Sequence, residues 1–595
     1  MSSQEGLDEV LTKLGIGPWN FLFFTANFLV TTVLPTFLIG SEFMNPMPNF
    51  TCNVPNNTHT ASYNGSECVM VDEENVQVPC TSWNYDTSVF HSTIAMEWDL
   101  VCEKALLIPL YQTIYTVGCL LGSILAAYVA HRFGRRWAVR VGALGTVLGT
   151  VVFLTTPWLY LLLASRFILG ITVSTMICPS FMLCMEVCVP RLRPTVGVVL
   201  ALPYALMMIF LALLAYFVRD WRTLHAAATF PLLLLFIPVL YLVDESPRWL
   251  LVHGRVHETV KVLQRGARLN KVMLPETTIL TAIISPTSED IVATNDKSCK
   301  GPDPRNMQIA VVESDENSQM RCAVIKLEHN LGDGSMKTHK DGNKSNTISK
   351  ISTNSLGAED GIGSWWAGPV ALVRSSCMRK IMCLLVTIYF LQGIVYLGLP
   401  LSSNSFSSPF LYMMLLGVVE VPAYSLTAPI TKRLGRRTVI SFCFFTCGIL
   451  LLSLVVLDKI AFSIELVNLT MVLLSYLLVC TSFQVSFLFA PELLPTTLRS
   501  WGTAACMVSS NIGYCVSPLI TDYLTEDYPW ISMVAFGLCA ILAGSLVFLL
   551  PETNGQPMLE TVADLRKRLS HKKLSKTDID DAITNTNYKE GSPLD

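Results

Sequence analysis

The sequence predicts an all-α membrane protein with 12 transmembrane helices, arranged as two homologous six-helix halves. First, 51% of the 595 residues are hydrophobic and only 15% are charged, whereas soluble proteins carry about 25% charged residues. Second, twelve apolar runs have roughly the 20-residue length that crosses a bilayer. Third, three short motifs recur about 300 residues apart, each after such runs. Together these observations indicate a duplicated membrane domain.

The apolar runs fall into two sets of six. The first set lies near 19–40, 107–130, 137–156, 158–181, 195–218 and 225–243. The second set lies near 379–400, 409–430, 437–457, 467–489, 502–521 and 530–550. The run 19–40 lacks the basic start and the small-residue cleavage site of a signal peptide, so we interpret it as the first helix. The halves therefore span 19–243 and 379–550.

The repeated motifs mark equivalent positions in the two halves. They pair Gly134-Arg135-Arg136 with Gly435-Arg436-Arg437, Glu186 and Arg193 with Glu492 and Arg499, and Asp244-Glu245-Ser246-Pro247 with Pro551-Glu552-Thr553. Tandem halves of this kind are typical of secondary transporters, whose substrate site lies between the halves.

The distribution of Lys and Arg predicts that both termini are cytosolic. The short loops after the second and eighth runs are rich in these residues, whereas 41–103 contains none. By the positive-inside rule, 41–105 is extracellular. Arg219 and Arg222, between the fifth and sixth runs, fall outside and count mildly against this orientation.

The segment 41–105 also has the chemistry of an extracellular loop. Four cysteines in an oxidising compartment predict two disulfides, with three possible pairings. Three glycosylation acceptors add to this assignment. The cysteines are Cys52, Cys68, Cys80 and Cys102, and the acceptors are Asn49, Asn56 and Asn64.

The remaining segments are predicted to be cytosolic: 1–18, the connection 244–378 and the tail 551–595. Residues 248–270 have the pattern of short amphipathic helices. The insert 285–362 is polar with few aromatic residues, so we expect it to be disordered. The basic part of the tail is expected to lie near anionic lipid headgroups, or else to be simply solvated.

The chain contains no catalytic or nucleotide-binding constellation on a suitable element. We therefore expect no enzymatic activity and no ATP-driven pump. We expect no cofactor, no metal site and no nucleic-acid partner.

The most specific motifs lie at the end of the first loop and at helix ends. They are Cys80-Thr-Ser-Trp83-Asn-Tyr85-Asp86, Glu97-Trp98-Asp99-Leu100-Val101-Cys102, Asp244-Glu-Ser-Pro-Arg-Trp-Leu-Leu251, Pro491-Glu-Leu-Leu-Pro-Thr496 and Pro551-Glu-Thr-Asn-Gly-Gln-Pro557. With these motifs the chain resembles the organic cation/anion transporter family (solute carrier family 22-like) of the major facilitator superfamily. The resemblance runs from about Leu7 to Thr561 outside the insert. Sugar porters share some signatures but lack the Cys-rich first loop.

The resemblance implies the major facilitator fold and gating roles for charged helix ends. Carboxylates and guanidinium groups there are expected to pair across the half-interface and to separate as the halves rock, although simple solvation of helix ends is an alternative. His131 stands where the family has Asp, which implies a closing latch that is weakened or pH-sensitive. The gating residues are His131, Arg132, Arg135, Arg136, Glu186, Arg193, Arg436, Arg437, Glu492 and Arg499.

Glu420 lies deep in a predicted span, where a charge is expensive and functional by default. We interpret it as a cation-coordinating carboxylate; the alternative is a hydrogen bond that shapes the kink at Pro422. The resemblance also implies a pocket containing Tyr204, Tyr389, Tyr396 and Gln484. Aromatic rings attract ammonium ions, but Ile177 replaces a Trp that the family has in the fourth span.

Asn511 occupies the family's charge-selecting position, twelve residues after Arg499. Cation transporters of the family have Asp there, and anion and carnitine-type members have Arg. The neutral amide favours neither charge, and its alternative role is a hydrogen bond to a neighbouring helix. We expect no Arg or Lys at mid-membrane to meet an anion, so Glu420 shifts the expectation to cations and zwitterions.

The sequence thus predicts a plasma-membrane secondary transporter with alternating access. Its expected substrates are small organic cations or zwitterionic amines, in a chain surrounded by membrane lipid. A transport-dead receptor or scaffold that uses the extracellular loop is the alternative, and a sugar porter is the third reading.

Overall fold

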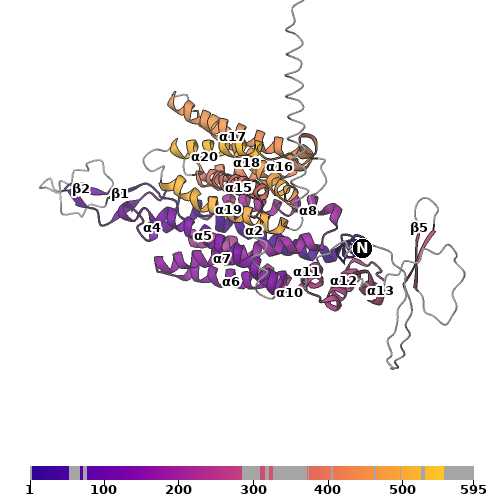
Figure 1. Ribbon diagram of the computed structural model, residues 1–595. Helices are drawn as coiled ribbons and strands as arrows, with labels where there is room; N and C mark the ends of the chain where they lie inside the picture. Colours follow the sequence, from indigo (N-terminus) through magenta and orange to yellow (C-terminus); the bar gives the residue numbers. More distant parts are fainter. Residues whose placement is uncertain are drawn as a thin grey trace, which may run out of the picture. The chain divides into compact units, whose positions relative to one another are not determined.

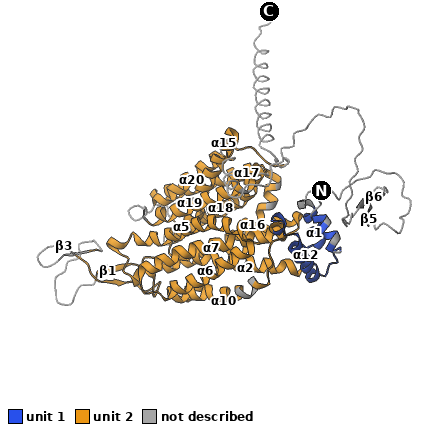
Figure 2. Cartoon of the chain, turned by 60° about the horizontal axis from the view of Figure 1, so that its bottom comes forward, with its two compact units in different colours: residues 1–15, 250–365 blue, residues 16–249, 366–595 orange. Residues whose placement is uncertain are grey.

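The computed structural model describes residues 3–52, 68–71, 77–275, 277–284, 309–314, 320–325, 372, 374–403, 406–460, 464–495, 498–523 and 530–554. The chain divides into two compact units (Figure 2). Unit 1 contains Met1–Gly15 and Leu250–Trp365, and unit 2 contains Ile16–Trp249 and Trp366–Asp595.

Unit 2 is a bundle of long helices (Figure 1). Its N-terminal half contains α2 (Pro18–Leu38), α5 (Leu107–Arg132), α6 (Arg135–Thr155), α7 (Leu159–Val187), α8 (Arg193–Val199), α9 (Leu202–Phe217) and α10 (Trp221–Leu242). Its C-terminal half contains α15 (Ser376–Leu401), α16 (Pro409–Leu434), α17 (Arg436–Lys459), α18 (Glu465–Leu493), α19 (Arg499–Pro518), the π-helical turn η4 (Leu519–Tyr523) and α20 (Trp530–Phe548).

The helices confirm the predicted membrane fold. Among the described residues, eleven helices are long and apolar enough to cross a membrane. Each predicted span coincides with a helix, and the fifth is built from α8 and α9 in succession. The sixth span coincides with α10, which is not one of the eleven.

The helices pack within each half, and the two halves meet along two pairs of helices. In the N-terminal half α7 packs against both α5 and α6, and in the C-terminal half α17 packs against α18 and α20. The halves meet where α9 packs against α16 and where α5 packs against α19.

We call the helix ends next to α3 (Ser41–Met44) the loop face, and those next to Gly134 and Gly435 the arginine face.

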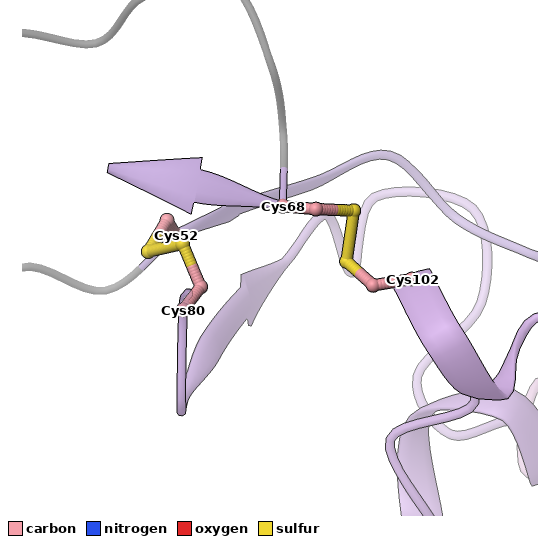
Figure 3. The surroundings of a disulfide bond; sticks show 4 residues. All are labelled: Cys52, Cys68, Cys80 and Cys102. Carbon is pink, nitrogen blue, oxygen red and sulfur yellow. A yellow bond between two sulfur atoms is a disulfide. The ribbon is translucent and has the colours of Figure 1, made fainter. Parts of the chain in front are cut away.

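The first loop is built from short strands closed by disulfides (Figure 3). Strand β1 (Phe50–Cys52) pairs with β4 (Trp83–Tyr85), and β2 (Val69–Val71) pairs with β3 (Gln77–Pro79), both antiparallel. Cys52 is bonded to Cys80, and Cys68 to Cys102. The predicted pair of disulfides is therefore confirmed, and the structure selects one of the three pairings. Asn49 is exposed; Asn56 and Asn64 lie outside the described residues.

The two arginines that argued against the predicted orientation hold this loop to the bundle. Arg222 forms an ion pair with Glu97 at 2.7 Å. Arg219 Nη1 donates to the Ser88 carbonyl at 2.9 Å. Trp221 Nε1 donates to the second Glu97 oxygen at 3.0 Å. A structural role therefore accounts for both positive charges at the loop face.

Unit 1 contains packed helices and one hairpin. The helices α1 (Ser3–Leu14), α12 (Val256–Asn270) and α13 (Thr277–Ile284) contact one another. Together with α11 (Pro247–Val252), α12 confirms the helices predicted for 248–270.

The insert 285–362 differs in part from its predicted disorder. Strand β5 (Ile309–Ser314) pairs antiparallel with β6 (Met320–Ile325). Both strands contain β-branched residues, which favour the extended conformation. The rest of the insert and the tail from residue 555 lie outside the described residues.

Some helices approach each other closely because a glycine with no side chain lies at the contact. Gly170, at the contact between α5 and α7, is one of these glycines. A Cβ at Gly170 would lie 2.2 Å from the Tyr115 carbonyl oxygen on α5. Gly170→Ala should therefore force α5 and α7 apart and destabilise the protein by about 1–3 kcal/mol. The measurement is the thermal midpoint of the purified protein.

Gly197→Ala is the matched control, because its Cβ would meet only the flexible end of Met185 at 3.2 Å. Equal midpoints for the two variants would contradict this account of the α5–α7 contact.

Candidate functional site

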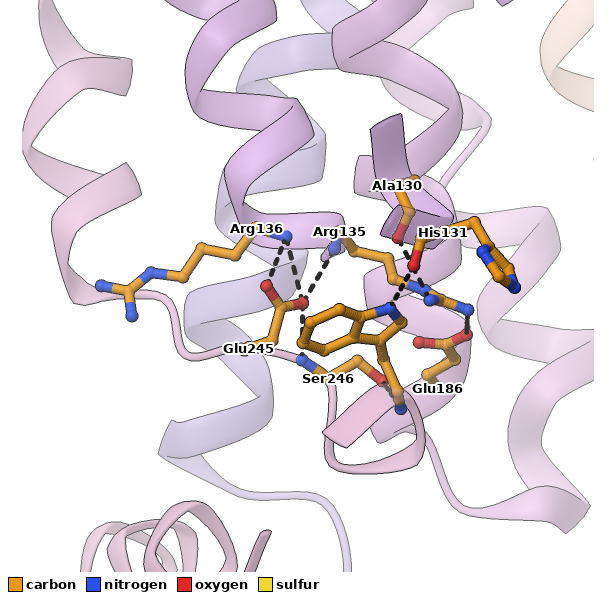
Figure 4. Close-up of polar contacts among 8 residues, drawn as sticks. Ala130, His131, Arg135, Arg136, Glu186, Glu245 and Ser246 are labelled. Carbon is orange, nitrogen blue, oxygen red and sulfur yellow. Dashed lines mark hydrogen bonds and ion pairs between the residues drawn. The ribbon is translucent and has the colours of Figure 1, made fainter. Parts of the chain in front are cut away.

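The repeated motifs build a carboxylate-capped helix start at the arginine face (Figure 4). The backbone amides of Arg135 and Arg136, at the start of α6, donate to the Glu245 carboxylate at 2.9–3.2 Å. A carboxylate is stabilised there by the unpaired amides and by the positive end of the helix dipole. Burial raises the pKa of Glu245, while the amide hydrogen bonds and Arg135 act in the opposite direction.

The C-terminal half repeats this arrangement. The amides of Arg436 and Arg437, at the start of α17, donate to Glu552 at 3.0 and 3.1 Å. The preceding glycines explain the motif, since Gly134 and Gly435 have φ values of +105° and +84°, a region that favours glycine. A Cβ at Gly134 would also lie 2.3 Å from the Glu245 carboxylate.

The gating carboxylates pair within their own half. Arg135 forms an ion pair with Glu186 at 3.0 Å, and Arg436 forms one with Glu492 at 3.2 Å. Pairing of these two carboxylates across the half-interface was expected, but it does not occur among the described residues in this conformation. Each Glu–Arg pair instead joins two helix ends of the same half, α6 to α7 and α17 to α18.

The other predicted gating residues lie around these turns. Arg499 Nε donates to the Pro491 carbonyl at 2.9 Å. The exposed His131 accepts a bond from Trp249 Nε1 at its carbonyl at 2.9 Å, and its ring points away from Glu245 (Figure 4). Arg136 and Arg437 donate to the carbonyls of Tyr241 and Phe548. Arg132 is exposed, and Arg193 is half-buried at the start of α8.

Glu420 lies fully buried on α16, next to the contact between the halves. Its Oε1 accepts hydrogen bonds from the Tyr396 hydroxyl at 2.9 Å and from the Tyr424 hydroxyl. Its Oε2 has no hydrogen-bond partner in the described part of the chain. One carboxylate oxygen is thus fixed by two tyrosines, and the other keeps its acceptor capacity.

Aromatic rings surround this carboxylate. The Tyr396 ring stacks on Phe483 with centroids 4.7 Å apart, and on Tyr476 at 6.0 Å. Tyr204, on α9 of the other half, interacts electrostatically with Glu420. Gly417 lets α9 approach at this level, because a Cβ there would lie 2.7 Å from the Ile209 side chain. The cluster therefore joins both halves around one negative charge.

Three predicted pocket residues do not contact this cluster through hydrogen bonds. Tyr389 donates to the Ser486 carbonyl at 2.7 Å, which ties α15 to α18. Gln484 is half-buried on α18. Asn511 donates to the Ser123 hydroxyl at 3.4 Å across the α5–α19 contact, so it bridges the halves. Ile177 packs partly buried against the core.

The halves also meet at the loop face. The ring of Phe410 lies 5.6 Å from Phe43 and 5.5 Å from Phe90, residues of the opposite half. Beside these rings, the Ser403 hydroxyl donates to Glu42, which is buried. Burial raises the pKa of Glu42, and the nearby Asp522 carboxylate raises it further.

Sequence reasoning missed several charged residues of unit 2. The expectation that no Arg lies at mid-membrane did not consider Arg166, which lies inside the predicted span 158–181 and is fully buried within α7. Its position inside a predicted span was the signal that could have found it. The recurrence of Glu245 and Glu552 was visible in the sequence, but their capping role required the folded turn. Nothing in the sequence indicated that Glu42 lies near Asp522.

The chain is similar in sequence to several known transporters. A family model of sugar (and other) transporters matches residues 35–290 and 374–564. The chain is 28% identical to solute carrier family 22 member 20 of Mus musculus, over 82% of this chain and 75% of that protein. It is 26% identical to a Drosophila melanogaster β-alanine transporter, over 82% of this chain and 69% of that protein.

Two further comparisons cover nearly the whole chain. An organic cation transporter protein of Drosophila melanogaster is 24% identical, over 94% of both chains. The structure of the xylose transporter XylE from E. coli in an inward-open conformation has a TM-score of 0.56 and 16% identity. It covers 90% of this chain and 96% of XylE. This likeness shows the fold.

The capped helix start makes a prediction for Glu245. Glu245→Gln removes the charge that the helix dipole and two amides stabilise, so it should lower the stability of the purified protein by about 1–2 kcal/mol. Glu9→Gln on α1 is the control, because Glu9 lies outside the first turn of its helix and forms an exposed ion pair with Lys13, which is worth at most about 1 kcal/mol. A thermal midpoint of Glu245→Gln no lower than that of the control would refute the capping role.

The loop-face contact should depend on pH. Glu42 accepts a hydrogen bond from the Ser403 hydroxyl and interacts electrostatically with Asp522 and Tyr412. The pKa of Glu42 is raised when the contact is closed. Closing the contact therefore protonates Glu42 at any pH between the ordinary carboxyl pKa of 4.5 and the raised pKa. The stabilisation is complete at low pH and is lost as the pH rises through this window, by at most about 1.4 kcal/mol per pH unit.

The measurement uses Ser402→Cys, a buried position beside Ser403. An impermeant thiol reagent applied at the loop face should label it faster as the pH rises, after correction for the reagent's own pH dependence with an exposed cysteine. The same labelling in a Glu42→Gln background should lose most of this pH dependence. An unchanged pH profile in Glu42→Gln would contradict the assignment.

Proposed function

The chain belongs to the sugar (and other) transporter family, and on this premise we propose that it carries small organic cations or zwitterionic amines across the membrane by alternating access. The single observation that carries the proposal is the buried Glu420, with one oxygen held by two tyrosines and the other without a partner among the described residues. A charge at this depth is retained for a function.

The chemistry of the cluster favours a positively charged amine. The open carboxylate oxygen can accept a charge-assisted hydrogen bond from an ammonium group. The stacked rings of Tyr396 and Phe483 present aromatic surface to the same ligand, and such surface attracts cations. Tyr204 lies on the opposite half and interacts with Glu420, so the affinity for substrate would depend on the relative position of the halves.

The polar groups nearby favour a zwitterion as well as a simple cation. Asn511 and Gln484 offer amide donors to a carboxylate, and Asn511 already bridges the halves. One relative of the chain is named as a β-alanine transporter, and β-alanine carries an ammonium and a carboxylate group. We therefore include zwitterionic amines in the proposed substrate class.

Transport requires that the contacts between the halves form and break. The loop face is closed here by Phe410, Phe43 and the Glu42–Ser403 bond. We propose that these contacts separate when the opposite face closes, and that the Glu186 and Glu492 ion pairs rearrange in the same step. We assign the loop face to the outside of the plasma membrane and both termini to the cytosol, because Lys and Arg gather at the arginine face.

Glu420→Gln tests the proposal directly. The substitution keeps the size of the side chain but removes the charge that would pair with the substrate amine. Surface-corrected uptake of a small organic cation should fall about tenfold or more, which corresponds to about 1.4 kcal/mol. Glu103→Gln, at an exposed loop position, should leave uptake unchanged. Normal uptake by Glu420→Gln at equal surface level would sink the proposed site.

The charge at position 511 should shift selectivity. Asn511→Asp should raise apparent cation affinity by about tenfold, since most of the roughly 4 kcal/mol attraction between charges 4 Å apart is lost to desolvation. Asn511→Arg should depress cation uptake. Competition curves against radiolabelled cation, at matched surface expression, measure both effects. Equal losses in both variants would instead assign Asn511 to the hydrogen bond with Ser123 alone.

A further inference from the structure

Arg166 is a fully buried arginine whose hydrogen-bond partners are all neutral. One nitrogen, Nη2, donates to the Phe37 carbonyl at 3.1 Å and to Gln112 Oε1 at 3.0 Å. Gln112 is in turn fixed by its own bond to the Leu38 carbonyl at 2.6 Å. In the described part of the chain, Arg166 has no carboxylate partner, and its Nε and Nη1 atoms have no hydrogen-bond acceptor.

The surroundings of Arg166 add further donors and no negative group. The guanidinium lies over the rings of Tyr111 and Tyr115, 4.3 and 4.6 Å from their centroids. The Tyr111 hydroxyl is buried and has no partner among the described residues. His225 is also fully buried, interacts electrostatically with Arg166, and has neither ring nitrogen bonded within the described residues.

This arrangement leaves a permanent positive charge without a negatively charged partner among the described residues. An arginine side chain does not deprotonate in proteins, so the guanidinium cannot escape the cost of burial by becoming neutral. Buried charges are normally paired, because an isolated one is strongly unfavourable in a low-dielectric interior. Two aromatic faces and two carbonyl-type acceptors offset part of this cost, and two guanidinium nitrogens remain unused.

We propose that Arg166, with the Tyr111 hydroxyl and His225, binds a small monovalent anion inside the N-terminal half. A chloride ion and a substrate carboxylate share the necessary chemistry: one negative charge and acceptor capacity for two or three donors. The site is built by α5, α7 and α10 alone, apart from the Phe37 carbonyl of α2. It therefore differs from the Glu420 cluster, which joins the two halves, and does not rest on the proposed transport function.

The experiment uses the purified full-length protein in gluconate buffer at constant ionic strength, because gluconate is a carboxylate far larger than the small anion that the site is proposed to bind. Chloride and acetate are titrated separately in place of gluconate, and the thermal midpoint is followed. An anion that binds the folded state raises the midpoint saturably, so at least one of the two should give a rise of a few degrees. A response to chloride identifies a halide site, and a response to acetate identifies a carboxylate site.

Gln112→Glu is the decisive variant, because it places a carboxylate of nearly the same shape at Arg166 Nη2. It should raise the midpoint in gluconate and abolish the anion response, since the internal charge replaces the bound anion. Gln264→Glu on α12, the same substitution outside the membrane helices, should keep the response. If Gln112→Glu does not fold, Arg166→Gln must lose the anion response.

Two results would overturn the proposal. One is the absence of a saturable response to either anion in the unsubstituted protein. The other is an equal response in Gln112→Glu or Arg166→Gln, which would place the anion elsewhere.

Discussion

A charge inside the membrane must be compensated within the protein, because hydrocarbon provides neither water nor counterions. This constraint explains the arrangement of the buried charges in unit 2. Glu420 is held by two tyrosine hydroxyls, and Glu42, just outside the first span, is held by the Ser403 hydroxyl. Arg166 lies between carbonyl-type acceptors and aromatic faces. In each case the compensation is incomplete, and the uncompensated part defines where a substrate, a proton or an anion would act.

The duplicated motifs solve a related problem at the arginine face. A helix that begins there exposes unpaired backbone amides, and a carboxylate from the end of the same half accepts them. Glu245 does this for α6 and Glu552 for α17, and a glycine before each helix leaves room for the carboxylate. The Glu–Arg pairs of each half sit on the same turns. Each half thus carries the same set of contacts between its helix ends.

In the proposed transport cycle, function depends on the contacts between the two halves. The α9–α16 contact carries Tyr204 and Glu420, and the α5–α19 contact carries Ser123 and Asn511. Because residues of both halves contribute to each contact, any relative movement changes the environment of the buried carboxylate. At the loop face, Phe410 packs against rings of the opposite half and buries Glu42 beside Asp522. In the proposed transport cycle, a single movement of the halves would therefore change access to the site, the environment of Glu420 and the protonation of Glu42.

The sequence by itself determined the twelve helices, the two halves and the two disulfides as a pair, because apolar length, repeated motifs and cysteine number are local properties. It also located Glu420, since a carboxylate stands out within an apolar run. Only the tertiary structure decided which groups compensate each charge, Tyr396 and Tyr424 for Glu420 and Arg135 for Glu186. It also decided which cysteines pair, as Cys52 does with Cys80. Partners in a helix bundle are far apart in sequence, and their pairing depends on how the helices cross.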